Sequence, residues 1–256
     1  MVTAYDYSIA CLLEETRINA ILVGDSLGMV MLGYENTLSV TLDDMVHHTR
    51  AVSRGTKSPL LVADLPFLSY HTGVADCVKN AGRLIQEGHA EAVKLEGGVE
   101  FTNEIKALVR ASIPVMGHLG LTPQSVHAFG GFKVQGKTIE QAQKVLDAAR
   151  SLQDAGVFSI VLEGIPQSLG AKITAELEVP IIGIGAGVCD GQVLVWQDML
   201  GISKRTPKFV KRFANLSVEI VAAVNDFAAA VEEGSFPKPE HCYSVENEAE
   251  IMSHLH

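Results

Sequence analysis

The sequence lacks the features that direct a chain to nucleic acid, to a membrane or to a disulfide scaffold. Its 20 Lys and Arg are outnumbered by 30 Asp and Glu, and the net charge of -10 argues against a phosphate backbone as partner. No apolar run reaches the length of a membrane span, and acidic residues interrupt the first apolar stretch, as a signal peptide would not allow. The four cysteines show no CxxC spacing, so we expect reduced thiols in a cytoplasmic protein rather than a zinc or redox motif.

Low-complexity segments and internal repeats are also absent. At 256 residues and 47% hydrophobic composition, the chain can bury one sizeable core, and we expect residues 1–256 to form a single domain. No GxGxxG motif follows the first apolar run, although a doubly wound sheet that binds a dinucleotide would carry one there.

What the sequence does contain is a regular alternation of short apolar runs with longer helical patterns. The helical stretches repeat apolar residues every three or four positions, whereas the runs between them are almost continuously apolar, as buried parallel strands are. Eight such runs predict a (β/α)8 barrel, with the doubly wound open sheet as the alternative. The predicted strands span 1–5, 20–25, 59–66, 92–97, 113–119, 159–165, 180–187 and 192–200.

The C-terminal part of the chain lies beyond the eighth predicted strand. Residues 208–234 form an amphipathic pattern that predicts one or two helices packed outside the barrel, and we expect 208–256 as a whole to be peripheral.

Acidic residues end four of the apolar runs: Asp25, Asp64, Glu96 and Glu163. His118 ends a fifth run between them. In a parallel barrel the carboxyl ends of all strands open on one face, where active sites are built, so we expect these side chains to meet there. Several carboxylates at one mouth need a cation or shared protons, and all-oxygen ligation is typical of Mg²⁺. The alternative is that each acid caps the helix after its strand.

Three other features at this face allow more than one interpretation. Lys94 could attract a substrate carboxylate, form a Schiff base, or pair with a neighbouring acid. We interpret His118 as a polar contact to substrate, with a structural role as the alternative. The glycine-rich turn 183–187 could bind phosphate or simply let two loops pass closely.

Eight segments closely resemble the ketopantoate hydroxymethyltransferase family, also called 3-methyl-2-oxobutanoate hydroxymethyltransferases. The resemblance extends from residue 2 to about residue 215, although the family usually carries a further helix before "TAYD". The matching segments are "TAYD" (3–6), residues 21–52, "ADLPF" (63–67), "VKLEGG" (93–98), "GHLGLTPQS" (117–125), "GGFKVQGK" (130–137), "LEGIP" (162–166) and "IGIGAG" (182–187).

This resemblance implies a specific reaction and a specific set of site residues. The expected reaction transfers a hydroxymethyl group from 5,10-methylenetetrahydrofolate to 3-methyl-2-oxobutanoate through a Mg²⁺-stabilised enolate, giving ketopantoate for pantothenate synthesis. The expected assembly is a homo-decamer built as a pentamer of dimers. The implied roles are Mg²⁺ ligation by Asp25 and Asp64 with Glu96 nearby, 2-oxo acid binding by Asp25, Ser26, Asp64 and Lys94, and proton removal by Glu163.

Three alternative functions remain at this point. A lyase resembling phosphoenolpyruvate mutases and isocitrate lyases would share the acidic rim, but it usually carries a cysteine or serine on a mobile loop as acid, and the loop 127–137 has no cysteine. A metal-free aldolase would use Lys94 as its Schiff-base residue. A barrel without catalytic activity would only bind an oxo acid or serve in an assembly.

Overall fold

Eight parallel strands form the centre of the molecule in the computed structural model, which describes residues 1–255. They pair in sequence order, each with the next. The sheet closes on itself, because Thr3 N donates to the Leu194 carbonyl at 3.1 Å and Val2 bridges to Leu194 in parallel. The strands are β1 (Val2–Thr3), β2 (Ala20–Val23), β3 (Leu60–Asp64), β4 (Ala92–Glu96), β5 (Val115–Gly120), β6 (Ser159–Glu163), β7 (Ile181–Ile184) and β8 (Gly191–Gln192).

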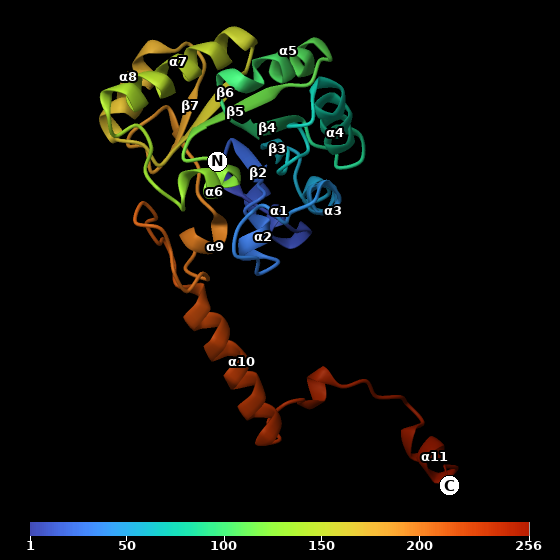
Figure 1. Cartoon of the computed structure of the whole chain (residues 1–256). Coiled ribbons are helices and arrows are strands. Elements are labelled where there is room, and N and C mark those ends of the chain that lie inside the picture. The colour runs from blue at the N-terminus through green and yellow to red at the C-terminus, as the bar shows by residue number, and fades with distance from the viewer. Residues whose placement is uncertain (256) are drawn as a thin grey trace.

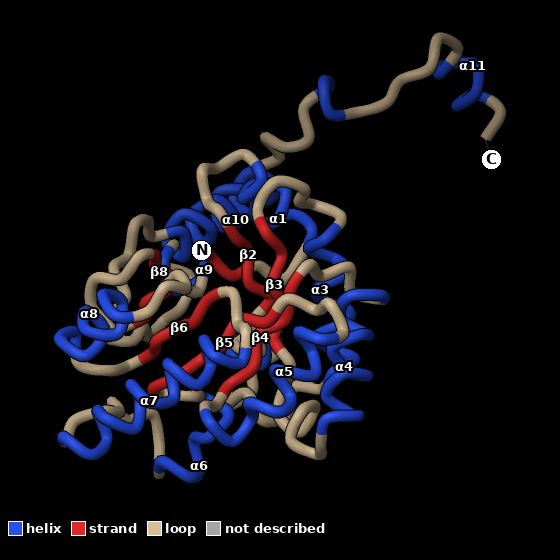
Figure 2. Tube along the Cα trace, turned by 90° about the horizontal axis from the view of Figure 1, so that it is seen from above, coloured by secondary structure: helices blue, strands red, loops and turns tan. Residues whose placement is uncertain are grey.

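Helices surround this barrel, as Figures 1 and 2 show. The predicted (β/α)8 architecture is therefore confirmed, and the open-sheet alternative is wrong. The α-helices are α1 (Tyr7–Glu14), α2 (Leu27–Val30), α3 (Leu42–Ser53), α4 (Val74–Gln86), α5 (Thr102–Arg110), α6 (Val126–Phe129), α7 (Ile139–Ala155), α8 (Gln167–Glu176), α9 (Trp196–Met199), α10 (Leu216–Glu232) and α11 (Glu248–Ser253). Short 3-10 helices span Val99–Phe101, Pro123–Ser125 and Pro239–His241.

The apolar core has an outer and an inner part. The outer part lies between strands and helices, whereas the inner part fills the barrel and includes Val62, Ala92, Met116 and Val161. Side chains alternate across a strand, so a residue two positions after an inward one also points inward. This period directs the polar residues at the strand ends into the mouth of the barrel.

The last predicted strand is much shorter than expected. The sequence predicts a strand over 192–200, but β8 spans only Gly191–Gln192, pairing ends with the single bridge at Leu194, and α9 already begins at Trp196. The neighbouring strand β1 explains the short β8. Because Asp6 caps α1, β1 ends at Thr3 and leaves little backbone with which the end of β8 can pair. Thr3 Oγ1 instead accepts a hydrogen bond from Trp196 N at 3.1 Å.

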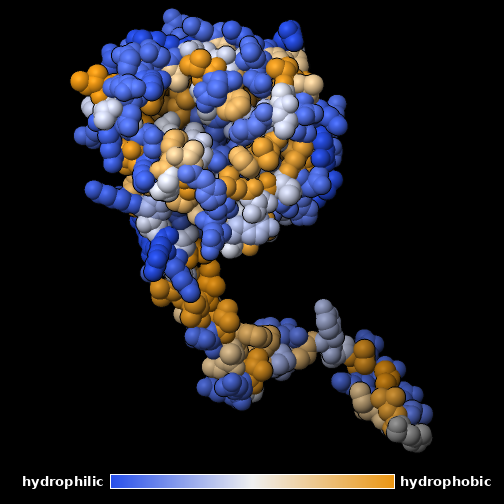
Figure 3. Space-filling model, viewed as in Figure 1, coloured by the Kyte–Doolittle hydropathy of each residue, from blue (hydrophilic) through white to orange (hydrophobic). Residues whose placement is uncertain are grey.

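Residues 208–234 contain a helix outside the barrel, as expected, but the expectation that this helix packs on the barrel is wrong. Helix α10 forms within this range, but it projects away from the barrel in Figure 1, and none of its residues is buried. Its apolar side chains remain exposed, and they give the projecting helix the orange surface of Figure 3. An amphipathic pattern predicts that a helix has an apolar face, but it does not identify the surface that covers this face. The final residue of the predicted peripheral tail, His256, lies outside the described residues.

Candidate active site

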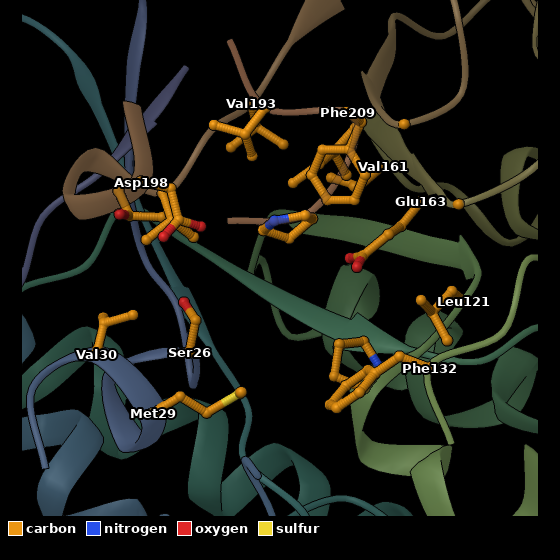
Figure 4. A pocket seen from close by; sticks show the side chains of 18 of the residues that line it. Ser26, Met29, Val30, Leu121, Phe132, Val161, Glu163, Val193, Asp198 and Phe209 are labelled. Carbon is orange, nitrogen blue, oxygen red and sulfur yellow. The ribbon is translucent and has the colours of Figure 1, made fainter. Parts of the chain in front are cut away.

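The predicted acids meet at the carboxyl ends of the strands, around one pocket with a volume of about 1270 Å³. Val62 and Ala92 point into the barrel, so Asp64 and Lys94, two positions further along their strands, also point inward. The carboxylate of Glu163 enters the pocket between Phe209 and Phe132 in Figure 4. All the residues predicted for the site line this pocket: Asp25, Ser26, Asp64, Lys94, Glu96, His118 and Glu163.

Two cationic groups separate the carboxylates. Lys94 Nζ lies 3.0 Å from Asp64 Oδ1 and 3.3 Å from His118 Nδ1. The His118 ring in turn lies 3.3 Å from Glu96 Oε1 through Nδ1 and 3.3 Å from Glu163 Oε2 through Nε2. His118 thus connects the two glutamates, and Lys94 adjoins Asp64.

The alternative in which the acids cap helices does not agree with the structure. The helices and 3-10 helix that follow these strands begin after Ser26, Gly73, Gly98 and Pro166, and none of these N-cap residues is an acid. The four acids are therefore not helix caps, and their carboxylates are available to bind a ligand in the pocket.

Burial and mutual repulsion set the protonation of the acids. Burial, reinforced by Glu96 and Asp64, raises the pKa of Asp25 well above its usual range. Burial acts in the same direction on Glu96, but the hydrogen bond with His118 outweighs it and the pKa of Glu96 is lowered. Ionising Asp25 is therefore costly unless a cation offsets the burial and the neighbouring carboxylates.

The cationic groups keep their protons. Burial and Lys94 lower the pKa of His118, but hydrogen bonds with Glu163 and Glu96 outweigh them and raise it to about 9. Burial also lowers the pKa of Lys94, and the charges of Asp64, Glu96 and Asp25 overcome this and raise it. A protonated ammonium is not a nucleophile, so this pocket disfavours the Schiff-base role of Lys94.

Sequence reasoning missed Gln124, which connects two of the predicted metal ligands. Its Nε2 donates to Asp25 Oδ2 at 2.8 Å and to the Leu65 carbonyl at 3.0 Å, and its backbone N donates to Glu96 Oε2 at 2.9 Å. The buried Tyr70 hydroxyl lies 2.9 Å from Gln124 Oε1. Gln124 lies in the motif 117–125, but an amide does not titrate, and only its contacts reveal its role.

Ser26 contributes a hydroxyl from the turn after β2. It precedes α2 without capping it through its side chain, and its Oγ lies 2.8 Å from the hydroxyl of the buried Tyr5. In Figure 4 this hydroxyl lies across the pocket from Glu163.

Oxygen donors in this pocket fit a hard cation such as Mg²⁺. Asp64 Oδ1 is buried and, although Lys94 Nζ is near, it accepts no hydrogen bond of good geometry. Both oxygens of Glu96 already contact Gln124 N or His118, which suits a contact to the ion through water. Among residues 1–255, no three His, Cys, Asp or Glu side chains already surround a single ion position. A site with two aspartates would need substrate and water to complete the coordination.

The glycine-rich turn after β7 lets chain segments pass closely. A Cβ at Gly185, where φ is +63°, would lie 2.7 Å from the Phe209 ring, and one at Gly187 would lie 2.5 Å from Gln167 Cβ. These contacts support the close-passage interpretation of the turn rather than a phosphate site.

Comparisons with known proteins identify the family. The family model of ketopantoate hydroxymethyltransferase matches residues 1–239. A 3-methyl-2-oxobutanoate hydroxymethyltransferase of Enterococcus faecalis is 59% identical over 97% of this chain and 91% of that protein. One from Clostridium novyi is 58% identical over 96% and 90%.

Solved structures show the same fold at low identity. Phosphoenolpyruvate phosphomutase from Streptomyces platensis has a TM-score of 0.60 at 14% identity, covering 100% of this chain and 86% of its own. A 2,3-dimethylmalate lyase of the PEP mutase/isocitrate lyase superfamily has a TM-score of 0.59 at 16% identity, covering 98% and 90%. Within residues 1–255, no helix combines the length and apolar character needed to span a bilayer.

Proposed function

The chain belongs to the ketopantoate hydroxymethyltransferase family, and we propose that it transfers a hydroxymethyl group to 3-methyl-2-oxobutanoate to form ketopantoate. We further propose 5,10-methylenetetrahydrofolate as the donor and Mg²⁺ as the metal, in a cytoplasmic enzyme. The observation that supports this most directly is the position of Glu163, a carboxylate that enters the pocket next to His118 and across from Ser26.

The aspartate side of the pocket would bind the 2-oxo acid. Asp25 and Asp64 would hold Mg²⁺, with Glu96 acting through water, and the ion would supply a Lewis acid to the keto and carboxylate oxygens. Lys94 would supply a buried positive charge to the substrate carboxylate. Its Nζ lies 3.0 Å from Asp64 Oδ1. The Ser26 hydroxyl offers a hydrogen bond from the same side of the pocket.

Glu163 would remove the proton from C3 of the oxo acid. His118 Nε2 faces Glu163 Oε2 at 3.3 Å, and the raised pKa of His118 keeps that nitrogen a donor. This contact orients the carboxylate, so its other oxygen can accept the C3 proton. The resulting carbon nucleophile attacks the one-carbon unit of the donor. Water adds to that carbon and becomes the hydroxyl of the new group; both C–N bonds of the donor break, and the C3 proton and the second proton of the water end on N5 and N10 of the released tetrahydrofolate.

Proton exchange at C3 tests this assignment without the folate donor. The enzyme is incubated with 3-methyl-2-oxobutanoate in D₂O, and loss of the C3 proton is followed by NMR. We expect exchange that requires Mg²⁺, is lost with EDTA, and falls at least about 100-fold in Glu163→Gln, which removes the base. Glu178→Gln, an exposed site on the outside of the barrel, is the matched control. Exchange in Glu163→Gln at the wild-type rate would show that Glu163 is not the base.

We also propose that the chain works as a homo-oligomer, a decamer by its resemblance to the family. The support from the structure is α10, where Val221, Val224 and Phe227 are each more than half exposed. A second copy of the chain is the occupant expected on this helix, because every copy exposes the same apolar face. Light scattering should give an oligomer for wild type and a smaller species for Val224→Glu/Phe227→Glu. A wild-type monomer at micromolar concentration would contradict the proposal.

A further inference from the structure

The pocket is far larger than a small branched oxo acid requires. Its volume of about 1270 Å³ exceeds the roughly 300–1000 Å³ of pockets that enclose drug-sized ligands. The polar residues described above occupy the aspartate side and the floor. Apolar and basic residues line the rest of the space, which leaves room for a second ligand beside the oxo acid.

Apolar side chains form the wall of this second space. Phe132 and Val134 come from the loop after α6, Leu121 follows β5, and Ile165 follows β6. Phe209 comes from the segment between α9 and α10 and lies on the other side of Glu163 in Figure 4. Two aromatic rings beside a base provide a surface for a flat ring system.

A basic segment borders the same space at the mouth. Residues 201–213, which we name the basic strap, carry five of the chain's 20 Lys and Arg and no Asp or Glu. Lys204, Arg205 and Lys208 of the strap line the pocket. Within residues 1–255 none of these three has a carboxylate within 4.0 Å. In a protein of net charge -10, three unpaired cations at one pocket mouth favour an anionic ligand there.

Contacts at both ends of the basic strap hold it over the mouth. At its start, Ile202 N and Ser203 N donate to the Gln197 carbonyl at 2.8 and 3.2 Å. At its end, Arg212 Nη2 donates to the Ser203 carbonyl at 2.8 Å, and Phe213 N donates to the Met199 carbonyl at 2.8 Å. The Phe209 ring packs on the bare backbone of Gly185 at the end of β7. The strap is therefore a closed loop with a defined position.

We propose that the basic strap binds the carboxylate tail of the folate donor through Lys204, Arg205 and Lys208, while the donor's rings lie between Phe209 and Phe132. This inference rests on the proposed function, because it concerns the second substrate of the same site. Folate donors carry one or several linked glutamates, so their tail is a polyanion attached to a flat ring system. The same pocket is lined by the base, by the aromatic wall and by the three cations. The tail then extends out of the mouth, where further glutamates remain in solvent near the strap.

Donor chain length provides the test. We would measure KM for 5,10-methylenetetrahydrofolate with one and with five glutamates, for wild type and for Lys204→Gln/Arg205→Gln/Lys208→Gln. Wild type should prefer the longer donor by about tenfold in KM, since each partly exposed charge contact contributes a modest amount. The triple variant should lose this preference, so that the two KM values agree within about twofold. The preference of wild type should also weaken as salt is raised, because the contacts are screened.

A charge-matched variant separates the strap from net charge. Lys57→Gln/Lys79→Gln/Lys106→Gln removes the same charge at residues that do not line the pocket and should keep the tenfold preference. Free γ-linked triglutamate tests the tail site without the ring system of the donor. Its inhibition should be weak and competitive with the donor. Inhibition that is competitive only with the oxo acid would overturn the proposal.

The outcomes for the strap and for the reaction are distinct. No C3 exchange in wild type would refute the proposed function itself. Exchange in wild type together with equal KM values for the two donors would refute only the strap proposal. A triple variant that keeps the full wild-type preference would also refute it, provided that circular dichroism shows the variant to be folded.

Discussion

Replacing Gln124 by leucine should weaken both the fold and the metal site, and the size of each effect follows from the contacts of the amide. The substitution keeps the volume and removes the two hydrogen bonds from Nε2 to Asp25 Oδ2 and the Leu65 carbonyl, as well as the contact between Oε1 and Tyr70. The backbone bond to Glu96 remains. Each buried group left without a partner costs about 1–3 kcal/mol. Tyr70 keeps its contact with the Glu96 carbonyl, so two groups are orphaned and the expected loss is about 2–6 kcal/mol.

The metal effect has a different origin. Asp25 loses the donor that orients it, and loss of such a supporting contact typically lowers metal affinity by about 10–100-fold. Urea denaturation of the EDTA-treated protein measures the first effect, and titration with Mn²⁺ followed by EPR measures the second.

Gln197→Leu is the matched control for this prediction. Gln197 is also a buried glutamine at the pocket, but its Oε1 accepts no hydrogen bond from residues 1–255, and its Nε2 contacts only the sulfur of Met31. Its replacement should cost less than about 1 kcal/mol. If Gln124→Leu and Gln197→Leu are equally stable and Gln124→Leu keeps wild-type Mn²⁺ affinity, Gln124 does not position Asp25.

Three further predictions concern the same site. Lys94→Met should raise KM for the oxo acid more than it lowers kcat, because it removes the charge for the substrate carboxylate. Borohydride treatment with substrate should leave the wild type unmodified, and a covalent adduct would restore the Schiff-base mechanism. Gly120→Ala should cost about 2–4 kcal/mol in urea denaturation, since φ is +95° and the new Cβ would lie 2.2 Å from the Glu163 carbonyl. Because the pKa of His118 is raised to about 9, metal-free protein should lose up to roughly 3 kcal/mol of stability between pH 6.5 and 9. His118→Gln should lack this dependence of stability on pH, and an unchanged dependence would contradict the assignment.

The sign of that pH dependence follows from the proton count. The folded protein binds a proton at His118 that the unfolded chain releases above about pH 6.5. Stability from this proton is therefore complete below the unfolded pKa and disappears as the pH rises through the folded value.

The sequence by itself determined the barrel and the identity of the residues at its mouth. Parallel strands buried on both faces must be continuously apolar, so an acid such as Asp64 or Glu96 at the end of such a run has to lie at the rim. Strand–helix alternation then requires the strand ends to share one face, which brings together residues 22 to 45 positions apart. The residue types alone indicated a hard cation such as Mg²⁺, whereas the predicted reaction and residue roles came from the resemblance to the family.

Only the tertiary structure decided how these residues act on one another. The role of Lys94 was open in the sequence, because a pKa depends on burial and on neighbours from other strands, here Asp64 and His118. Gln124 was missed because an amide shows its role only through the groups it contacts. The position of α10 was predicted wrongly for a related reason: periodicity records that a helix has an apolar face, whereas the surface that covers it is a property of the whole assembly. Sequence determines which groups exist and on which face of an element they lie, and long-range packing determines their partners.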